Sequence, residues 1–119
     1  MSAIRPNFGR FSSEVEALEA VVARIVDAID PDSIWLFGSR ARGDARPDSD
    51  FDLMVVGRVS AELGSDDYES VDRPLNGLGV GCDVVPCAAR DFDEALSLET
   101  SFVARVVREG RKVYEAPAR

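Results

Sequence analysis

The longest periodic stretch of this chain is an apolar stripe of helical spacing that begins near Ser13. Its members recur three or four residues apart and are Val15, Leu18, Val21, Val22, Ile25, Val26 and Ile29. Ser13 and Glu16 have the spacing of a capping box, and Pro31 stops the helix at its other end. We therefore predict an amphipathic helix over about residues 13–30, with an apolar face that must pack on another element.

Short apolar runs later in the chain predict the strands of a sheet. They cover residues 34–37, 50–56 and 80–85, the last closed by Pro86, and residues 112–114 are expected to add a fourth strand. Further helical segments are expected between and after them: one helix with an irregular end within 58–79, a short helical turn within 88–95, and a helix from Phe102 to Gly110. Gly110 is the expected C′ residue of that last helix, a position where glycine is commonly left-handed.

This order of elements predicts an α/β (α+β) fold, in which helices flank a small mixed sheet of about four strands. The length of 119 residues suits a single domain over residues 1–119. Residues 1–11 show no clear periodicity, and we expect them to form an extended or loosely docked arm.

The charge balance limits the partners. Twenty-two acidic residues against 14 basic ones give a formal net charge of −8, and Lys112 is the sole lysine of the sequence. Because long nucleic acids are bound mainly by basic residues, direct binding of such a partner is not expected. The sequence has no histidine, so any metal would be held by oxygen ligands, which favour magnesium or manganese.

The location of the protein is expected to be cytoplasmic. The chain has no apolar run of the ~18 residues that a membrane-spanning helix needs, and residues 1–10 lack the apolar core of a signal peptide. Cys82 and Cys87 match no zinc-binding pattern, and we expect both to be free thiols.

A stretch rich in glycine, arginine and aspartate, residues 38–49, joins the first two predicted strands. It opens with Gly38-Ser39 and continues into a segment that can form a helical turn. The N–H groups of such a turn, the space left by glycine and the Ser39 hydroxyl all suit a phosphate. A lone Gly-Ser pair, however, is more often an ordinary turn.

Asp50 and Asp52 follow at the start of the second strand. Their i, i+2 spacing places both carboxylates on one face, where they repel each other unless a cation lies between them. Asp-x-Asp alone is more often a solvated strand edge. Asp83 changes that balance, because an aspartate inside an apolar strand is costly unless it is paired or bound to metal. If the second and third strands are neighbours, the three acids form a two-metal site for phosphoryl transfer.

The motif Gly-Ser, ten residues, Asp-x-Asp and a later strand Asp resembles the DNA polymerase β-like nucleotidyltransferase superfamily. The string GSRARGDARPDSDFDL looks like its minimal nucleotidyltransferase (MNT) branch in particular. The resemblance implies that Gly38 and Ser39 hold the phosphates of ATP. It also implies that Asp50 and Asp52 hold two Mg²⁺ ions, with Mn²⁺ as an alternative. Asp83 would ligate one ion and help to deprotonate the attacking hydroxyl.

The remaining candidates flank these residues. Arg40, Arg42 and Arg46 either contact the triphosphate or are solvated or paired with Asp44 and Asp48, and both interpretations stay open. Ser49 either orients the start of the Asp-x-Asp strand or caps it. Trp35 and Phe37 are expected to belong to the core.

The resemblance further implies a partner. Minimal proteins of this branch pair with a HEPN-domain toxin ribonuclease and, as its antitoxin, transfer AMP from ATP to one of its tyrosines. A charge of −8 suits a partner with basic patches. The alternatives are an antitoxin that acts by binding alone and an adenylyltransferase for a small molecule such as an aminoglycoside. The oligomeric state, homomeric or heteromeric, is left open by the sequence.

Overall fold

Helix α1 spans Glu14–Ile29, as the apolar stripe predicted, in the computed structural model, which describes residues 5–60 and 63–117. Half of the predicted capping box is present: the Ser13 hydroxyl accepts a hydrogen bond from the N–H of Glu16 at 3.1 Å. The Glu16 carboxylate accepts instead from the N–H and hydroxyl of Ser12. The stripe is buried against the sheet through Ala17, Leu18, Val21 and Ile25.

The sheet has four strands in the order β3-β2-β1-β4. Their bounds are Ser33–Phe37 for β1, Phe51–Val56 for β2, Cys82–Cys87 for β3 and Arg111–Glu115 for β4. Strand β1 is antiparallel to both of its neighbours, whereas β2 and β3 run parallel. The predicted mixed sheet and the predicted neighbourhood of the second and third strands are therefore confirmed.

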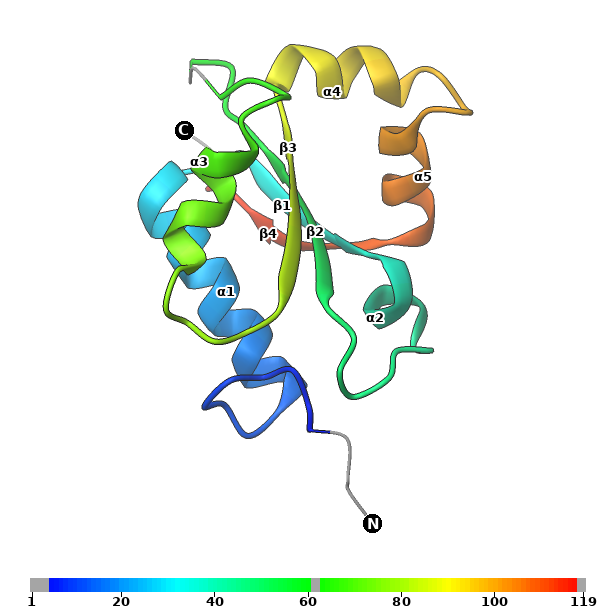
Figure 1. Ribbon diagram of the computed structural model, residues 1–119. Coiled ribbons are helices and arrows are strands. Elements are labelled where there is room, and N and C mark those ends of the chain that lie inside the picture. The colour runs from blue at the N-terminus through cyan, green and yellow to red at the C-terminus, as the bar shows by residue number, and fades with distance from the viewer. Residues whose placement is uncertain (1–4, 61–62, 118–119) are drawn as a thin grey trace.

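Helices cover both faces of this sheet (Figure 1). Helices α1 and α3 (Tyr68–Asp72) cover one face, and α4 (Ala89–Leu96) and α5 (Phe102–Glu109) cover the other. The side chains of β2 alternate between the two cores, with Leu53 and Val55 toward α1 and Met54 and Val56 toward α5. Trp35 and Phe37 pack into the second core, as predicted. Asp52 has the same parity as Met54 and so lies on the α5 face.

The segment between β2 and β3 differs from its prediction. Its helical part is limited to α3 and the 3₁₀ helix η1 (Arg73–Leu75), and residues 61–62 of the predicted helix lie outside the described residues. The Asp67 carboxylate accepts a hydrogen bond from the Gly64 N–H at 2.7 Å, which folds residues 64–67 into a turn before α3. This local bond competes with helix formation.

Proline and glycine also act differently from the prediction at two strand and helix ends. Pro86 lies inside β3 rather than closing it, because β3 is an edge strand, where a missing N–H is tolerated. Gly110 is extended (φ −93°, ψ −166°) rather than left-handed. A Cβ at Gly110 would overlap the carbonyl oxygen of Leu36, so close approach to β1 is the reason for glycine there.

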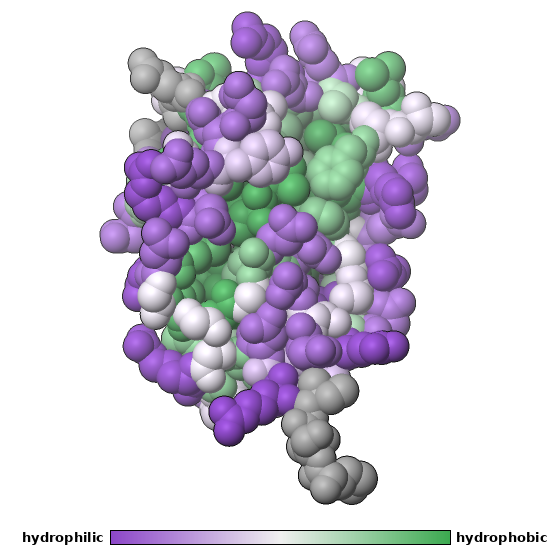
Figure 2. Space-filling model, in the orientation of Figure 1, coloured by the Kyte–Doolittle hydropathy of each residue, from purple (hydrophilic) through white to green (hydrophobic). Residues whose placement is uncertain are grey.

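Hydrophilic side chains cover most of the face shown in Figure 2, with an apolar strip over the upper part of β3. Cys82 and Cys87 are free thiols, as predicted, and Cys87 is buried. Within residues 5–60 and 63–117, no helix is both long enough and apolar enough to cross a membrane.

Candidate active site

The Gly38-Ser39 turn follows β1 directly and begins the five-residue helix α2 (Gly38–Arg42). Gly38 has a φ of +71°, and a Cβ there would overlap the Asp52 carboxylate. Any other residue would therefore be strained in its backbone and would collide with an acid of the site. The turn places the backbone of Gly38 against Asp52, and the binding of a phosphate there stays a prediction.

Strand pairing brings the three predicted acids to one edge of the sheet. Asp52 pairs with Phe37 on one side and directly with Asp83 on the other. Because β2 and β3 are parallel and in register at this pair, both carboxylates lie on the α5 face. Asp50 lies two residues before Asp52 and shares its parity. The second and third strands are thus neighbours, which is the condition under which the sequence placed the three acids together.

The three acids differ in burial. Asp52 is half-buried, whereas Asp50 and Asp83 are exposed. Contrary to the prediction, Asp83 carries no burial cost, because it is the second residue of an edge strand and is open to solvent. Burial, then the charges of Asp83 and Asp50, raise the pKa of Asp52 above its ordinary 3.8, and Arg42 opposes this shift.

A divalent cation fits this donor set. The groups are carboxylates, the charges around Asp52 are predominantly negative, and hard cations prefer such oxygens. In the described part of the chain, no three acidic or cysteine side chains already stand together in metal-binding geometry. The residues that could hold a cation here are nevertheless Asp50 and Asp52, together with Asp83.

One contact of the site was missed from the sequence. The Asn7 amide donates to the Asp50 carboxylate at 2.7 Å and accepts from the Gly81 N–H at 3.0 Å. Asn7 belongs to the segment expected to be a loose arm, and no motif marks it. Only the fold shows that this segment reaches the acids.

Comparison with known proteins decides the family. The sequence model of the nucleotidyltransferase domain matches residues 16–113, most of the chain. The chain belongs to the nucleotidyltransferase domain family. Its fold is similar to the crystal structure of a candidate nucleotidyltransferase from Sulfolobus solfataricus, with a TM-score of 0.56 and 22% identity over 82% of this chain and 77% of that one. No curated protein sequence matches the chain significantly.

Within this nucleotidyltransferase domain, Arg40 lies inside the structure rather than at its surface. Its side chain is 5% exposed and pairs with Glu14 at 2.8 Å. Its guanidinium lies over the rings of Phe8 and Phe51, at 5.1 and 4.7 Å from their centroids. It also donates to the carbonyls of Arg46, Pro47 and Ser49. These contacts give Arg40 a structural role, and its contact with a nucleotide stays a prediction.

The other candidates remain at the surface of the domain. Arg42 is half-exposed, pairs with Asp44 at 3.2 Å and influences Asp52 electrostatically. Arg46 is exposed. Its backbone N–H donates to the Ser49 hydroxyl at 2.9 Å, so Ser49 stabilises the loop between α2 and β2. The Ser39 carbonyl accepts from the N–H groups of Gly43 and Asp44, which ends α2.

A hollow of about 230 Å³ adjoins the Gly38 turn on the α5 face. It is lined by Phe37, Gly38, Arg42, Phe102, Arg105, Val106 and Glu109. Phe37 and Phe102 meet edge to face at 5.3 Å, and Phe102 is 48% exposed. Sequence analysis missed the α5 residues, because their spacing indicated only an apolar helical stripe.

Proposed function

We propose that this nucleotidyltransferase domain transfers AMP from ATP to an acceptor hydroxyl with the help of divalent cations. The observation that carries the proposal is the convergence of Asp50, Asp52 and Asp83 beside the Gly38 turn. Such a cluster costs free energy while it is unbalanced, and cation binding offsets that cost.

The residues divide the work between them. Gly38 and Ser39 bind the terminal phosphates, while Asp50 and Asp52 hold Mg²⁺. When bound, Mg²⁺ offsets the charge that develops on the attacking and leaving oxygens. The acceptor oxygen forms a bond to the α-phosphorus as the bond to pyrophosphate breaks, and Asp83 receives the hydroxyl proton.

The unequal burial of the acids supports these roles. Asp52 is half-buried on β2, whose backbone pairs with β1 on one side and β3 on the other, which suits a ligand that holds a cation in one place. Asp83 is exposed on an edge strand, where an acceptor arriving from solution can reach it. The hollow beside Gly38 adds Arg42 and Arg105, which suit the negative charge of a triphosphate.

For the acceptor we infer a tyrosine of a HEPN-domain toxin, which makes the chain an MNT-type antitoxin. The support is the GSRARGDARPDSDFDL string and the net charge of −8, which favours a basic partner such as a ribonuclease. The described residues form one sheet with its covering helices, and the hollow of about 230 Å³ is small for a bulky acceptor. A protein acceptor does not need a large pocket on this chain, because it brings its own binding surface.

The test is transfer of labelled AMP. The purified chain, Mg²⁺, α-labelled ATP and a cognate HEPN toxin should yield labelled toxin, and a Tyr→Phe toxin should stay unlabelled. Asp52→Asn should abolish labelling, while Asp93→Asn, an exposed acid of α4, should not. Protection of cells by the Asp52→Asn chain would instead favour an antitoxin that acts by binding alone. Pyrophosphate release with an aminoglycoside, but not with the toxin, would favour the small-molecule enzyme.

A further inference from the structure

The segment before α1, residues 5–11, contacts the chain just before β2 and β3, where the acids Asp50, Asp52 and Asp83 lie. In Figure 1 it passes below the sheet, close to the turn that leads into β3. Phe8 forms an isolated antiparallel bridge with Val80, and its ring lies 6.2 Å from that of Phe51. The Arg40 guanidinium lies over both rings. These contacts fix the backbone on the C-terminal side of Asn7.

Asn7 itself is held at three points. Its N–H donates to the Pro47 carbonyl at 2.8 Å, which ties it to the loop after α2. Its side-chain N–H donates to Asp50 Oδ1 at 2.7 Å, and its side-chain oxygen accepts from the Gly81 N–H at 3.0 Å. One amide therefore connects the start of β2 with the start of β3.

The space around this amide is fully used. A Cβ at Gly81 would overlap both Asn7 Nδ2 and Asp50 Oδ1. The closeness of the three groups thus depends on glycine at position 81, two residues before Asp83. A contact that a single added carbon would break is a built feature of the fold and not a chance meeting of surface side chains.

The chemistry of the amide suits the support of a cation ligand. An uncharged N–H donor orients a carboxylate without cancelling the negative charge that a cation needs. A carboxylate has two oxygens, so a bond to Oδ1 leaves Oδ2 for a cation. Asp50 is exposed, and without this bond its side chain would lose rotational freedom only when the cation binds.

We propose that Asn7 is a positioning residue that orients Asp50 as a cation ligand, which makes residues 5–11 part of the active site. This inference rests on the proposed function, since it assumes that Asp50 binds a cation. Through Gly81, Asn7 also links Asp50, the residue before β2, to the backbone that leads into β3 and Asp83.

The test measures cation binding without turnover. Binding of Mn²⁺ is followed by electron paramagnetic resonance in the presence of α,β-methylene-ATP, for the wild type, Asn7→Ala, Asn76→Ala and Asp52→Asn. Asn76 is the matched control, because it is exposed in a turn and its backbone N–H, rather than its side chain, donates to the Arg73 carbonyl. We expect Asn7→Ala to weaken Mn²⁺ binding about tenfold, and Asn76→Ala to leave it unchanged.

A purely structural role for Asn7 has a different signature. Asn7→Ala would then lower the unfolding temperature, while Mn²⁺ affinity measured well below that temperature would equal that of the wild type, and the inference would be overturned. As a second measurement, the Mg²⁺ concentration at half-maximal AMP transfer should rise about tenfold in Asn7→Ala, with a smaller change in kcat at saturating Mg²⁺.

Failure of the proposed function would look different again. If the wild type binds no Mn²⁺, or if Asp52→Asn binds it as well as the wild type, the proposed cation site itself is wrong and the inference falls with it. If the wild type binds, Asp52→Asn does not and Asn7→Ala matches the wild type, only the role of Asn7 is wrong.

Discussion

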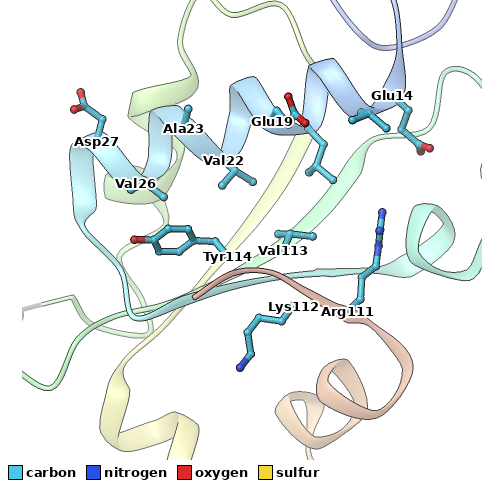
Figure 3. A pocket seen from close by; sticks show the side chains of 12 residues that line it. Glu14, Glu19, Val22, Ala23, Val26, Asp27, Arg111, Lys112, Val113 and Tyr114 are labelled. Carbon is cyan, nitrogen blue, oxygen red and sulfur yellow. The ribbon is translucent and has the colours of Figure 1, made fainter. Parts of the chain in front are cut away.

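Two regions of the molecule stand in contrast: the carboxylate cluster (Asp50, Asp52 and Asp83) and the α1–β4 groove. The groove has a volume of about 670 Å³ and is lined mainly by apolar side chains of α1 and by β4. Figure 3 shows Val22 and Val26 of the helix facing Val113 and Tyr114 of the strand. The acids, in contrast, converge at the opposite edge of the sheet, next to a hollow of about 230 Å³.

Chemistry, rather than size, distinguishes the proposed active site from the groove. At the carboxylate cluster, added atoms at Gly38 and Gly81 would overlap Asp52 and Asp50, and burial followed by like charges raises the pKa of Asp52. The groove contains neither constraint. It is the gap between a helix and an edge strand, bordered by Glu19 and Asp27. Substitutions should therefore separate the two regions clearly.

The largest effect is expected for Asp52→Asn. Loss of a cation ligand should reduce AMP transfer by about a thousandfold or more, as measured by initial rates with labelled ATP. Loss of its charge should leave the free energy of unfolding at neutral pH equal or higher, because burial and two neighbouring acids oppose that charge. A variant that transfers AMP at the wild-type rate would remove the carboxylate cluster as the active site.

The negative charge of the carboxylate cluster should also change the reactivity of a neighbouring thiol, that of Cys82. Burial, followed by the charges of Asp50, Asp72 and Asp52, raises the pKa of Cys82 to about 12. In a Cys87→Ser background, we expect alkylation of Cys82 near pH 8 to be at least about a hundredfold slower than in a short peptide. Mg²⁺ with α,β-methylene-ATP should accelerate it by partly balancing those acids. Peptide-like reactivity would contradict this environment.

Gly38, the first residue of α2, and Gly43, which follows its end, together test how closely the turn packs against Asp52. Gly43 also has a positive φ, of +83°, but a Cβ there would meet no atom within 4 Å. Gly43→Ala should cost about 1 kcal/mol from backbone strain alone. Gly38→Ala adds the overlap with Asp52 and should cost at least about 1 kcal/mol more, as measured by urea unfolding. Equal costs would show that the turn and the carboxylate are not in contact.

A pH dependence follows from the raised pKa of Asp52. The folded chain binds that proton more tightly than the unfolded chain, so the contribution is present below 3.8 and is lost as the pH rises through the raised pKa. The stability of the wild type relative to Asp52→Asn should therefore decrease over this interval and then stay constant. Paired urea titrations measure it, and a relative stability that increases with pH would contradict the sign.

The smallest effect is expected in the α1–β4 groove. Val15 is 64% exposed at its border, so Val15→Ser should change the free energy of unfolding by less than about 0.5 kcal/mol and leave AMP transfer to a small acceptor unchanged. Val21→Ala, on the buried face of the same helix, should cost about 1–3 kcal/mol. Loss of transfer in Val15→Ser would place the groove in the active site.

The sequence predicted best what depends on neighbours along the chain. The stripe of α1, the short apolar strands and the Gly38 turn all follow from local periodicity and composition. It failed where distant segments decide. Pro86 fits inside β3 only because that strand is at the edge, and Gly110 is needed because Leu36 lies against it.

The same limit applies within the site. The Asp-x-Asp spacing fixed the face that Asp50 and Asp52 share, but the exposure of Asp83 depends on the place of its strand in the sheet. Arg40 and Asn7 have no local signal for their roles. Their partners, Glu14 and Gly81, are far away in the sequence and meet them only in the folded chain.

The position of β3 at the sheet edge has a consequence for the timing of activity. Asp83 joins Asp52 only when β3 docks, after the crossover through α3, so a nascent chain has no complete site until β3 pairs with β2. Edge strands also open more readily than central ones. Brief detachment of β3 would separate Asp83 from Asp52 while β1 and β2 stay paired, and hydrogen exchange along β3 should report how often the site is intact.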